Sequence, residues 1–190
     1  MITENHGMKK IAIAVSGASG SIYAQRLINK LAGMNQVQLA VVMSKQAPEV
    51  WKHELGEVPQ LQAIATVFDI QNYQAPFASG SSTYEALVVC PCSMGTLGRI
   101  AHGISDNLIS RAADVMLKER RKLICVVRET PYNLVHLENM KKLTEAGGII
   151  CPATPSFYSK PSTIEALVDT VVDRVIQLLG ISMDTYRWNE

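Results

Sequence analysis

The sequence predicts a doubly wound α/β domain built on a parallel sheet, and two observations carry that prediction. Short, continuous apolar segments recur along the chain, which is typical of strands that are buried on both faces. Segments with helical spacing of apolar residues alternate with them, as the crossovers of a parallel sheet require. We therefore expect a single Rossmann- or flavodoxin-like domain over residues 8–190, preceded by a loose leader at residues 1–7.

The expected elements follow one another in strand–helix order. Strands are expected at 9–15, 37–43, 86–90, 123–127 and 149–151, with one short strand near 65–68. Helices are expected at 21–32, 46–54, 94–102, 108–120, 133–146 and 163–179. Most of residues 55–82 should be irregular, because Gly, Pro, Ser and Gln are frequent there. Pro91 should end the strand that precedes it, because proline has no N–H to donate to a sheet.

The composition excludes several classes of protein. The chain has 190 residues, 47% of them hydrophobic and 18% charged, which is enough for a substantial core. The net charge of +1 gives no field that would attract nucleic acid or an anionic membrane. No apolar run approaches the roughly 20 residues of a membrane span, and the first ten residues lack the apolar core of a signal peptide. We expect a cytoplasmic protein without nucleic-acid or membrane partners.

The four cysteines raise the question of a metal or redox site. Cys90, Cys92, Cys125 and Cys151 each stand at the end of an apolar segment, where small, buried thiols fit well. Cys90 and Cys92 are separated by one residue, whereas zinc-binding cysteine pairs are separated by two to four. The spacing therefore favours buried free thiols, as in a reducing cytoplasm, and no metal site.

Small and hydroxyl-bearing residues follow three of the predicted strands. They are the turn Ser-Gly-Ala-Ser-Gly at 16–20, Ser44, and Ser-Met-Gly-Thr at 93–96. Ligands of such folds bind beyond the carboxyl ends of the strands, so these segments should meet in one crevice. The N-terminus of the first helix, after Gly20, is a natural place for a phosphate. The turn matches neither GxGxxG nor a Walker loop, and a plain strand-to-helix turn is the alternative interpretation.

Basic residues suggest a second anion site. Arg128 and Glu129 follow the fourth strong strand directly, and Arg111 and Lys118 lie seven residues apart on one helix face. We expect Arg111, Lys118 and Arg128 to form this site, with surface ion pairing as the alternative. Arg174 interrupts an apolar helix face, where it either extends its charge to solvent or meets an anion from a neighbouring subunit.

Four segments together resemble the UbiX-type flavin prenyltransferases of the flavin-binding Cys decarboxylase-like superfamily. They are SGASG (16–20), PCSMGTLGRIAHGISDNLISRAADVMLKERR (91–121), RETP (128–131) and ATPSFYSKP (153–161). The resemblance implies bound FMN, a homo-oligomer that is commonly a dodecamer, and transfer of a dimethylallyl group from dimethylallyl monophosphate to N5 and C6 of reduced FMN. It also implies that the prenylated FMN serves a UbiD-type decarboxylase.

The resemblance assigns roles residue by residue. It implies that Glu129 is the acid/base, with Ser19 as a relay and Glu54 as a further acidic residue, and that Trp188 closes over the site. For the prenyl phosphate it implies Arg111, Lys118, Glu129, Tyr158 and Arg174. For FMN it implies Gly17, Ala18, Ser19, Ser44, Ser93, Met94, Gly95, Thr96 and Arg128.

Two other functions remain as alternatives. An FMN-dependent decarboxylase of the same superfamily would carry a His in the first helix and a loop like PASANT, where this chain has PCSMGT. A flavodoxin-like FMN carrier would have an acidic surface and no use for a second cationic site. In the central region only Asp106 and Asp114 stand as aspartates, eight residues apart, so the sequence predicts catalysis without magnesium.

Overall fold

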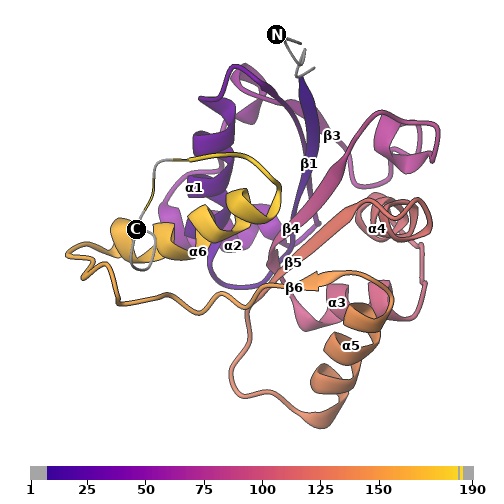
Figure 1. Cartoon of the computed structure of the whole chain (residues 1–190). Coiled ribbons are helices and arrows are strands. Elements are labelled where there is room, and N and C mark those ends of the chain that lie inside the picture. Colours follow the sequence, from indigo (N-terminus) through magenta and orange to yellow (C-terminus); the bar gives the residue numbers. More distant parts are fainter. Residues whose placement is uncertain (1–7, 184, 186–190) are drawn as a thin grey trace, which may run out of the picture.

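Six parallel strands form the sheet at the centre of the molecule (Figure 1). The computed structural model describes residues 8–183 and 185. The strand order is β3-β2-β1-β4-β5-β6, and the strands are β1 (Lys9–Val15), β2 (Val37–Met43), β3 (Thr66–Phe68), β4 (Ala86–Cys92), β5 (Lys122–Val127) and β6 (Ile149–Ile150). The chain winds outward from β1 in one direction and from β4 in the other. The carboxyl ends of β1 and β4 therefore flank the switch point at which such sheets bind ligands.

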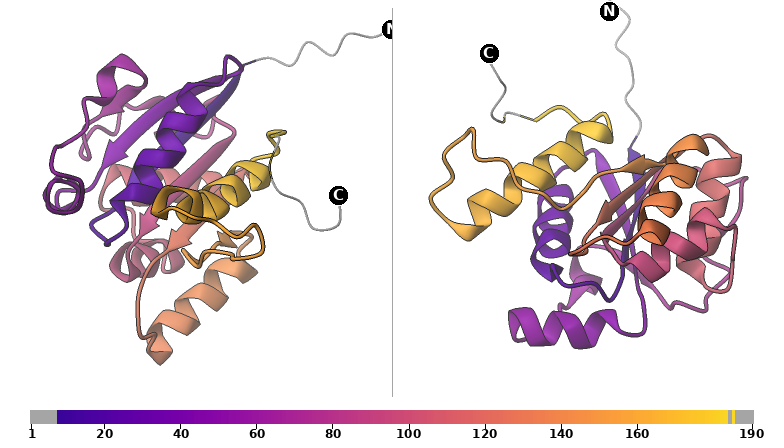
Figure 2. Two further views of the ribbon diagram at one scale, coloured as in Figure 1. Left: turned by 90° about the vertical axis from the view of Figure 1, so that its left-hand side faces the viewer. Right: turned by 90° about the horizontal axis from the view of Figure 1, so that it is seen from below.

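Helices cover both faces of the sheet, as the doubly wound prediction requires (Figure 2). One face packs against α1 (Ser21–Ala32), α2 (Ala47–Leu55) and α6 (Ile164–Leu178). The other face packs against α3 (Met94–Ala101), α4 (Leu108–Lys118) and α5 (Leu134–Glu145).

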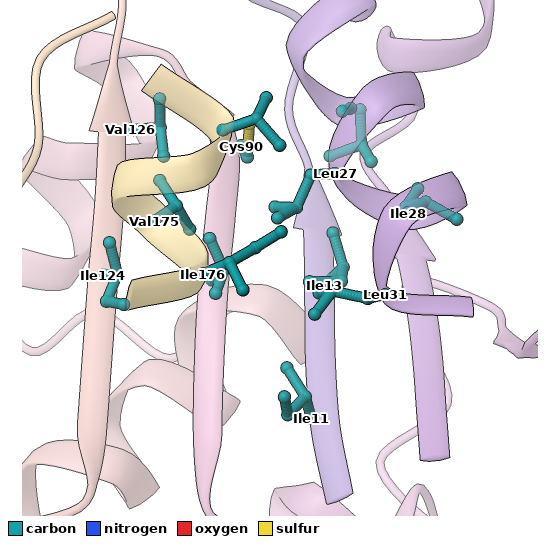
Figure 3. Packing of buried hydrophobic residues seen from close by; sticks show 14 of the residues in the cluster. Ile11, Ile13, Leu27, Ile28, Leu31, Cys90, Ile124, Val126, Val175 and Ile176 are labelled. Carbon is teal, nitrogen blue, oxygen red and sulfur yellow. The ribbon is translucent and has the colours of Figure 1, made fainter. Parts of the chain in front are cut away.

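Alternating side chains of the strands serve the two faces. In β1, Ile11 and Ile13 belong to the cluster under α1 and α6, whereas Ala12 and Ala14 belong to the cluster under α3 and α4. Figure 3 shows Ile13 between the helices that cover this face, beside Leu27 of α1 and Ile176 of α6. All three of these side chains are fully buried. Burial on both sides explains why the strands read as continuous apolar segments.

The segment between α2 and β4 is mostly irregular, as expected. It contains the short 3₁₀ helices Leu61–Ala63 and Pro76–Ala78 and the short edge strand β3 that the sequence predicted. Within the described residues, no helix has both the length and the apolar character needed to cross a membrane. The predicted leader, residues 1–7, and Trp188 lie outside the described residues.

The prediction that Pro91 ends its strand is wrong. Strand β4 continues through Pro91 to Cys92, which pairs with Val127 of β5 after a register shift that begins at Val89. The missing N–H is accommodated by this irregularity, and the Pro91 carbonyl is used elsewhere because it accepts a hydrogen bond from Ser16 Oγ at 2.7 Å. The prediction that the four cysteines are buried free thiols is confirmed.

Candidate active site at the carboxyl ends of the strands

A pocket of about 540 Å³ opens beyond the carboxyl ends of β1, β2 and β4. The sequence predicted a ligand crevice here, and the pocket is lined by predicted cofactor residues from all three strand ends: Gly17, Ser44, Ser93, Gly95 and Thr96. The three hydroxyl-bearing turns thus meet at one place.

Gly17 allows two of these turns to approach each other closely. A Cβ atom built on Gly17 would lie 2.7 Å from the Cβ of Gln46, which is closer than two carbon atoms can pack. Ser44 is held nearby, because its backbone N–H donates to the Val15 carbonyl at 2.8 Å. Only glycine therefore fits at this position without displacing the segment that follows β2.

Ser44 carries an unusual polar atom. Its Oγ is screened from solvent and has no hydrogen-bond partner among the described residues. Buried hydroxyls are almost always hydrogen-bonded, so this hydroxyl is suited to bond a ligand that enters the pocket. A phosphate oxygen is a suitable acceptor for it.

The N-terminus of α3 faces the same pocket. Ser93 is its N-cap, and the Ser93 Oγ accepts from the Thr96 N–H at 3.3 Å and contacts Thr96 Oγ1 at 3.0 Å. The helix presents its positive end and two hydroxyls to the pocket, which is the chemistry that a phosphate monoester requires. The residues present therefore fit the phosphate end of FMN.

The N-terminus of α1 differs from the expectation. The sequence predicted that a phosphate would take its free N–H groups, but the carboxylate of Glu54 already engages them. Glu54 accepts from the Gly20 N–H at 2.9 and 3.0 Å and from the Ser21 N–H at 2.7 Å. Sequence periodicity gives no sign of this contact, because it joins residues 33 and 34 positions apart.

These contacts keep Glu54 ionised. Burial raises the pKa of the carboxyl group. Hydrogen bonds from the Ser19 side chain and from the Ser21 and Gly20 backbone lower the pKa by more than burial raises it, so the pKa lies below the ordinary value. Ser19 is exposed at the mouth of the turn. The structure thus brings together Ser19 and Glu54, two of the predicted catalytic residues.

Arg128 lies beside this pair. Its backbone N–H donates to the Cys92 carbonyl at 3.2 Å, which places the residue directly after β5. Its Cγ lies 4.0 Å from the position that a Cβ of Gly20 would take. Glu129 follows, and its carboxylate accepts from the Thr130 N–H at 3.0 Å. The predicted residues of β5 therefore reach the same edge of the sheet as Glu54.

Arg174 lines a second pocket, of about 510 Å³, between α6 and the segment that follows β6. Hydroxyl groups of Thr154, Ser156 and Ser159 line it as well. Arg174 is exposed and donates to Gln177 at 3.3 Å. Tyr158 is 69% exposed and stands in the same segment, beside Ser159. Ser159, the neighbour of Tyr158 in the sequence, therefore lines the same pocket as Arg174.

Within one chain, Arg111 and Lys118 do not join Arg128, contrary to the prediction. Both lie on α4, and Arg111 donates to the Ala78 carbonyl at 3.1 Å and to Asp114 at 3.0 Å. Lys118 pairs with Glu119 at the end of α4. That end leads into the start of β5, so Lys118 lies at the amino edge of the sheet, opposite the crevice. Helical spacing correctly placed the two on one helix but could not show where that helix points.

Sequence reasoning missed six polar residues that line the first pocket. Lys45 and Gln46 immediately follow Ser44, and Arg99 stands one helical turn after Gly95, so spacing alone could have found these three. Asp106 and Asn107 come from the connection between α3 and α4, and no local pattern signals their position. Gln71 comes from the segment after β3. The full set missed is Lys45, Gln46, Gln71, Arg99, Asp106 and Asn107.

Among the described residues, no group of three or more His, Cys, Asp or Glu side chains is arranged to hold a metal ion.

Comparison with known proteins identifies the family. The Flavoprotein family model matches residues 2–176. The chain is 44% identical to the flavin prenyltransferase UbiX of Methanothermobacter thermautotrophicus, covering 95% of both chains. It is also 44% identical to the flavin prenyltransferase UbiX of Pseudomonas aeruginosa, covering 97% of this chain and 96% of the relative.

Solved structures agree with these relatives. The crystal structure of AnUbiX (PadA1) in complex with FMN and dimethylallyl pyrophosphate superposes with a TM-score of 0.89 at 42% identity, covering 96% of this chain and 98% of that one. A dodecameric FMN-dependent UbiX-like decarboxylase from Escherichia coli O157:H7 superposes with a TM-score of 0.91 at 36% identity, covering 95% and 100%. The chain therefore belongs to the flavoprotein family, among the UbiX flavin prenyltransferases.

Proposed function

We propose that this chain transfers the dimethylallyl group of dimethylallyl monophosphate to N5 and C6 of reduced FMN and releases phosphate. The observation that carries the proposal is the phosphate-ready pocket, with its orphaned Ser44 hydroxyl, next to an ionised Glu54. The family membership supports the same reaction.

The cofactor pocket holds FMN through the three strand-end turns. Bound reduced FMN supplies the nucleophilic positions of the reaction. Ser44, Ser93 and Thr96 bind the phosphate with the N-terminus of α3, Gly17 lets the backbone approach, and Arg128 lies at the β5 end. The full proposed set is Gly17, Ala18, Ser19, Ser44, Ser93, Met94, Gly95, Thr96 and Arg128.

The prenyl phosphate is bound by cationic and hydroxyl groups. Arg174 and Tyr158 hold it and stabilise the negative charge that develops as the carbon–oxygen bond breaks. Arg111 and Lys118 contribute from neighbouring subunits, because a single chain keeps them away from Arg128. This arrangement requires a homo-oligomer, and we propose a dodecamer, the state named for the Escherichia coli relative.

Carboxylates of the chain remove the proton that the reaction releases. Glu129 acts as the acid/base, and Ser19 passes a proton to Glu54, to which its side chain is hydrogen-bonded. A carboxyl group with a lowered pKa is ionised at neutral pH and can accept a proton. The phosphate departs without help from magnesium because Arg and Lys side chains supply the positive charge.

The proposed function also implies where the product goes and in which compartment the protein works. We propose that prenylated FMN leaves for a UbiD-type decarboxylase, which does the decarboxylation itself. The four free thiols suit a reducing cytoplasm.

The second candidate function is decarboxylation, which the names of two similar solved structures suggest. Two solved structures with 36–39% identity are called decarboxylases, one from Escherichia coli and a phenylacrylic acid decarboxylase from Aquifex aeolicus. An FMN-dependent decarboxylase would use FMN without changing its mass. Cysteine decarboxylases at 17% identity share only the fold.

One incubation separates the functions. The purified chain is incubated anaerobically with reduced FMN and dimethylallyl monophosphate, and the flavin is then analysed by mass and absorption spectra. We expect a flavin heavier by the prenyl group. An unchanged flavin mass, together with release of CO₂ from an aromatic acid by this chain alone, would instead establish the decarboxylase. Tight FMN binding with neither reaction would establish a flavin carrier.

A further inference from the structure

Arg99 occupies a position that none of the roles described so far explains. It lines the cofactor pocket from α3, one turn after the N-terminal residues of that helix. Its Nη1 donates to the Gly95 carbonyl at 3.1 Å and lies 3.5 Å from the point where a Cβ of Gly95 would stand. The guanidinium therefore lies against the first turn of α3 and lines the same pocket as Ser93 and Thr96.

Asp106 holds the other side of this guanidinium. Its carboxylate accepts from Arg99 Nε at 3.1 Å. It is itself fixed by the Asn107 side-chain amide at 2.8 Å and by the Ser110 hydroxyl at 3.3 Å. Two acceptors therefore orient Arg99, while further guanidinium N–H groups are left to donate elsewhere.

The ion pair itself does not account for this arrangement. The side chains of Arg99 and Asp106 are 48% and 50% exposed, and exposed pairs add little to the free energy of folding. Lys45 is the other cation that lines the pocket, but no hydrogen bond or ion pair within the described part of the chain orients it. Arg99 is thus the cation that the protein holds in place there.

We propose that Arg99 is the residue that recognises the phosphate dianion of FMN, and that Asp106 is the positioning residue that keeps it oriented. The inference rests on the proposed placement of FMN in this pocket. The hydroxyls of Ser44, Ser93 and Thr96 are neutral, whereas a phosphate monoester carries nearly two negative charges at neutral pH. A fixed guanidinium supplies charge-assisted hydrogen bonds to the phosphate that riboflavin, which has no phosphate, cannot form.

The test compares two flavins. FMN and riboflavin are titrated into the full chain by fluorescence, with wild type, Arg99→Met, and Lys141→Met as a control that removes one charge from exposed α5. We expect Arg99→Met to weaken FMN binding by about 10- to 100-fold and riboflavin binding by less than about 2-fold. Lys141→Met should leave both affinities unchanged. Unchanged riboflavin affinity also shows that the variant is folded.

Asp106→Asn tests the positioning role. It should lower the ratio of FMN to riboflavin affinity by about 3- to 10-fold, and it should lower this ratio no further in the Arg99→Met background, because coupled residues are not additive. Additive losses would overturn the positioning role, and an unchanged ratio in Arg99→Met would overturn the role of Arg99. The proposed placement of FMN, on which this inference rests, is tested independently of Arg99. It would be overturned if wild type bound no FMN or if a Gly17 variant bound FMN normally.

Discussion

The carboxylate of Glu54 lies 2.7 Å from the backbone nitrogen of Ser21 and closes the N-terminus of a helix that begins 33 residues earlier. The positive end of the α1 dipole and the backbone N–H groups stabilise the charged form of the carboxyl group. The Ser19 hydroxyl is hydrogen-bonded to the same carboxylate, which is therefore an ionised acceptor for it at neutral pH.

The first prediction concerns this acceptor. Glu54→Gln keeps the size and one acceptor oxygen but cannot take a proton. Prenyl transfer in single turnover should fall by roughly 10²- to 10⁴-fold, while FMN affinity, measured by fluorescence, stays near the wild-type value. The matched control is Glu49→Gln, an exposed change on the same helix. Wild-type turnover in Glu54→Gln would remove this residue from the mechanism.

The second prediction uses the close approach at Gly17. Gly17→Ala should weaken FMN binding strongly, because the new Cβ would sit 2.7 Å from the Gln46 Cβ and push the segment after β2 out of the pocket. Gln46→Gly removes that atom. The double variant should therefore recover much of the lost affinity. Failure of this rescue would show that Gly17 acts through some route other than contact with Gln46.

The third prediction separates transfer from cofactor binding. Glu129→Gln should slow prenyl transfer by roughly 10²- to 10⁴-fold. Arg174→Ala removes a charge-assisted bond to phosphate, worth about 1.5–3 kcal/mol, and should chiefly raise the concentration of prenyl phosphate needed. Both should bind FMN normally. Flavin titration and single-turnover assays of each variant check this prediction. Normal turnover in both variants would favour the alternative of a flavodoxin-like FMN carrier.

The fourth prediction concerns the pH dependence of stability. Asp169 joins α6 to α1, accepting from Arg26 Nε at 2.8 Å and pairing with Lys30 at 3.0 Å. Burial raises the pKa of Asp169, but Arg26 and Lys30 lower it by more than burial raises it. The pKa in the folded protein therefore lies below the ordinary aspartate value of 3.8. A carboxyl group whose pKa is lower in the folded than in the unfolded chain stabilises the fold at pH values above its unfolded pKa. This stabilisation is lost as the pH falls through the folded pKa.

Asp169→Asn should accordingly lower the free energy of unfolding at pH 7 by about 1–2 kcal/mol. The difference from wild type should shrink as pH falls below 3.8, which urea unfolding at several pH values measures. Glu85→Gln is the control, because its pair with Lys9 is long, at 3.8 Å, and exposed. A difference between Asp169→Asn and wild type that is independent of pH would contradict the assignment.

The fifth prediction is that EDTA leaves prenyl transfer unchanged. Arg and Lys side chains supply the positive charge that magnesium supplies elsewhere. Turnover with dimethylallyl monophosphate is measured after dialysis against the chelator, and again after magnesium is restored. Activity that disappears in EDTA and returns with magnesium would refute metal independence.

The sequence predicted the sheet and the crevice well, for physical reasons. Strands buried on both faces leave continuous apolar segments, and parallel strands bring their carboxyl ends to one edge, so Ser44 and Thr96 could be placed together. It failed where a contact depends on the direction of a helix or on a distant partner. Lys118 shares a helix face with Arg111, yet the path into β5 carries it to the wrong edge. Pro91 stays in its strand because β5 accepts an irregular register.

Ser16 links the two turns that form opposite walls of the cofactor pocket. Its buried Oγ donates to the Pro91 carbonyl at 2.7 Å and accepts from the Ser93 N–H at 2.8 Å, which ties the turn after β1 to the turn after β4. The two walls of the pocket are thereby fixed relative to each other before any flavin arrives. Flavin binding therefore immobilises little backbone. Two loose loops would lose conformational entropy when the ligand binds, whereas here that entropy is lost when the chain folds.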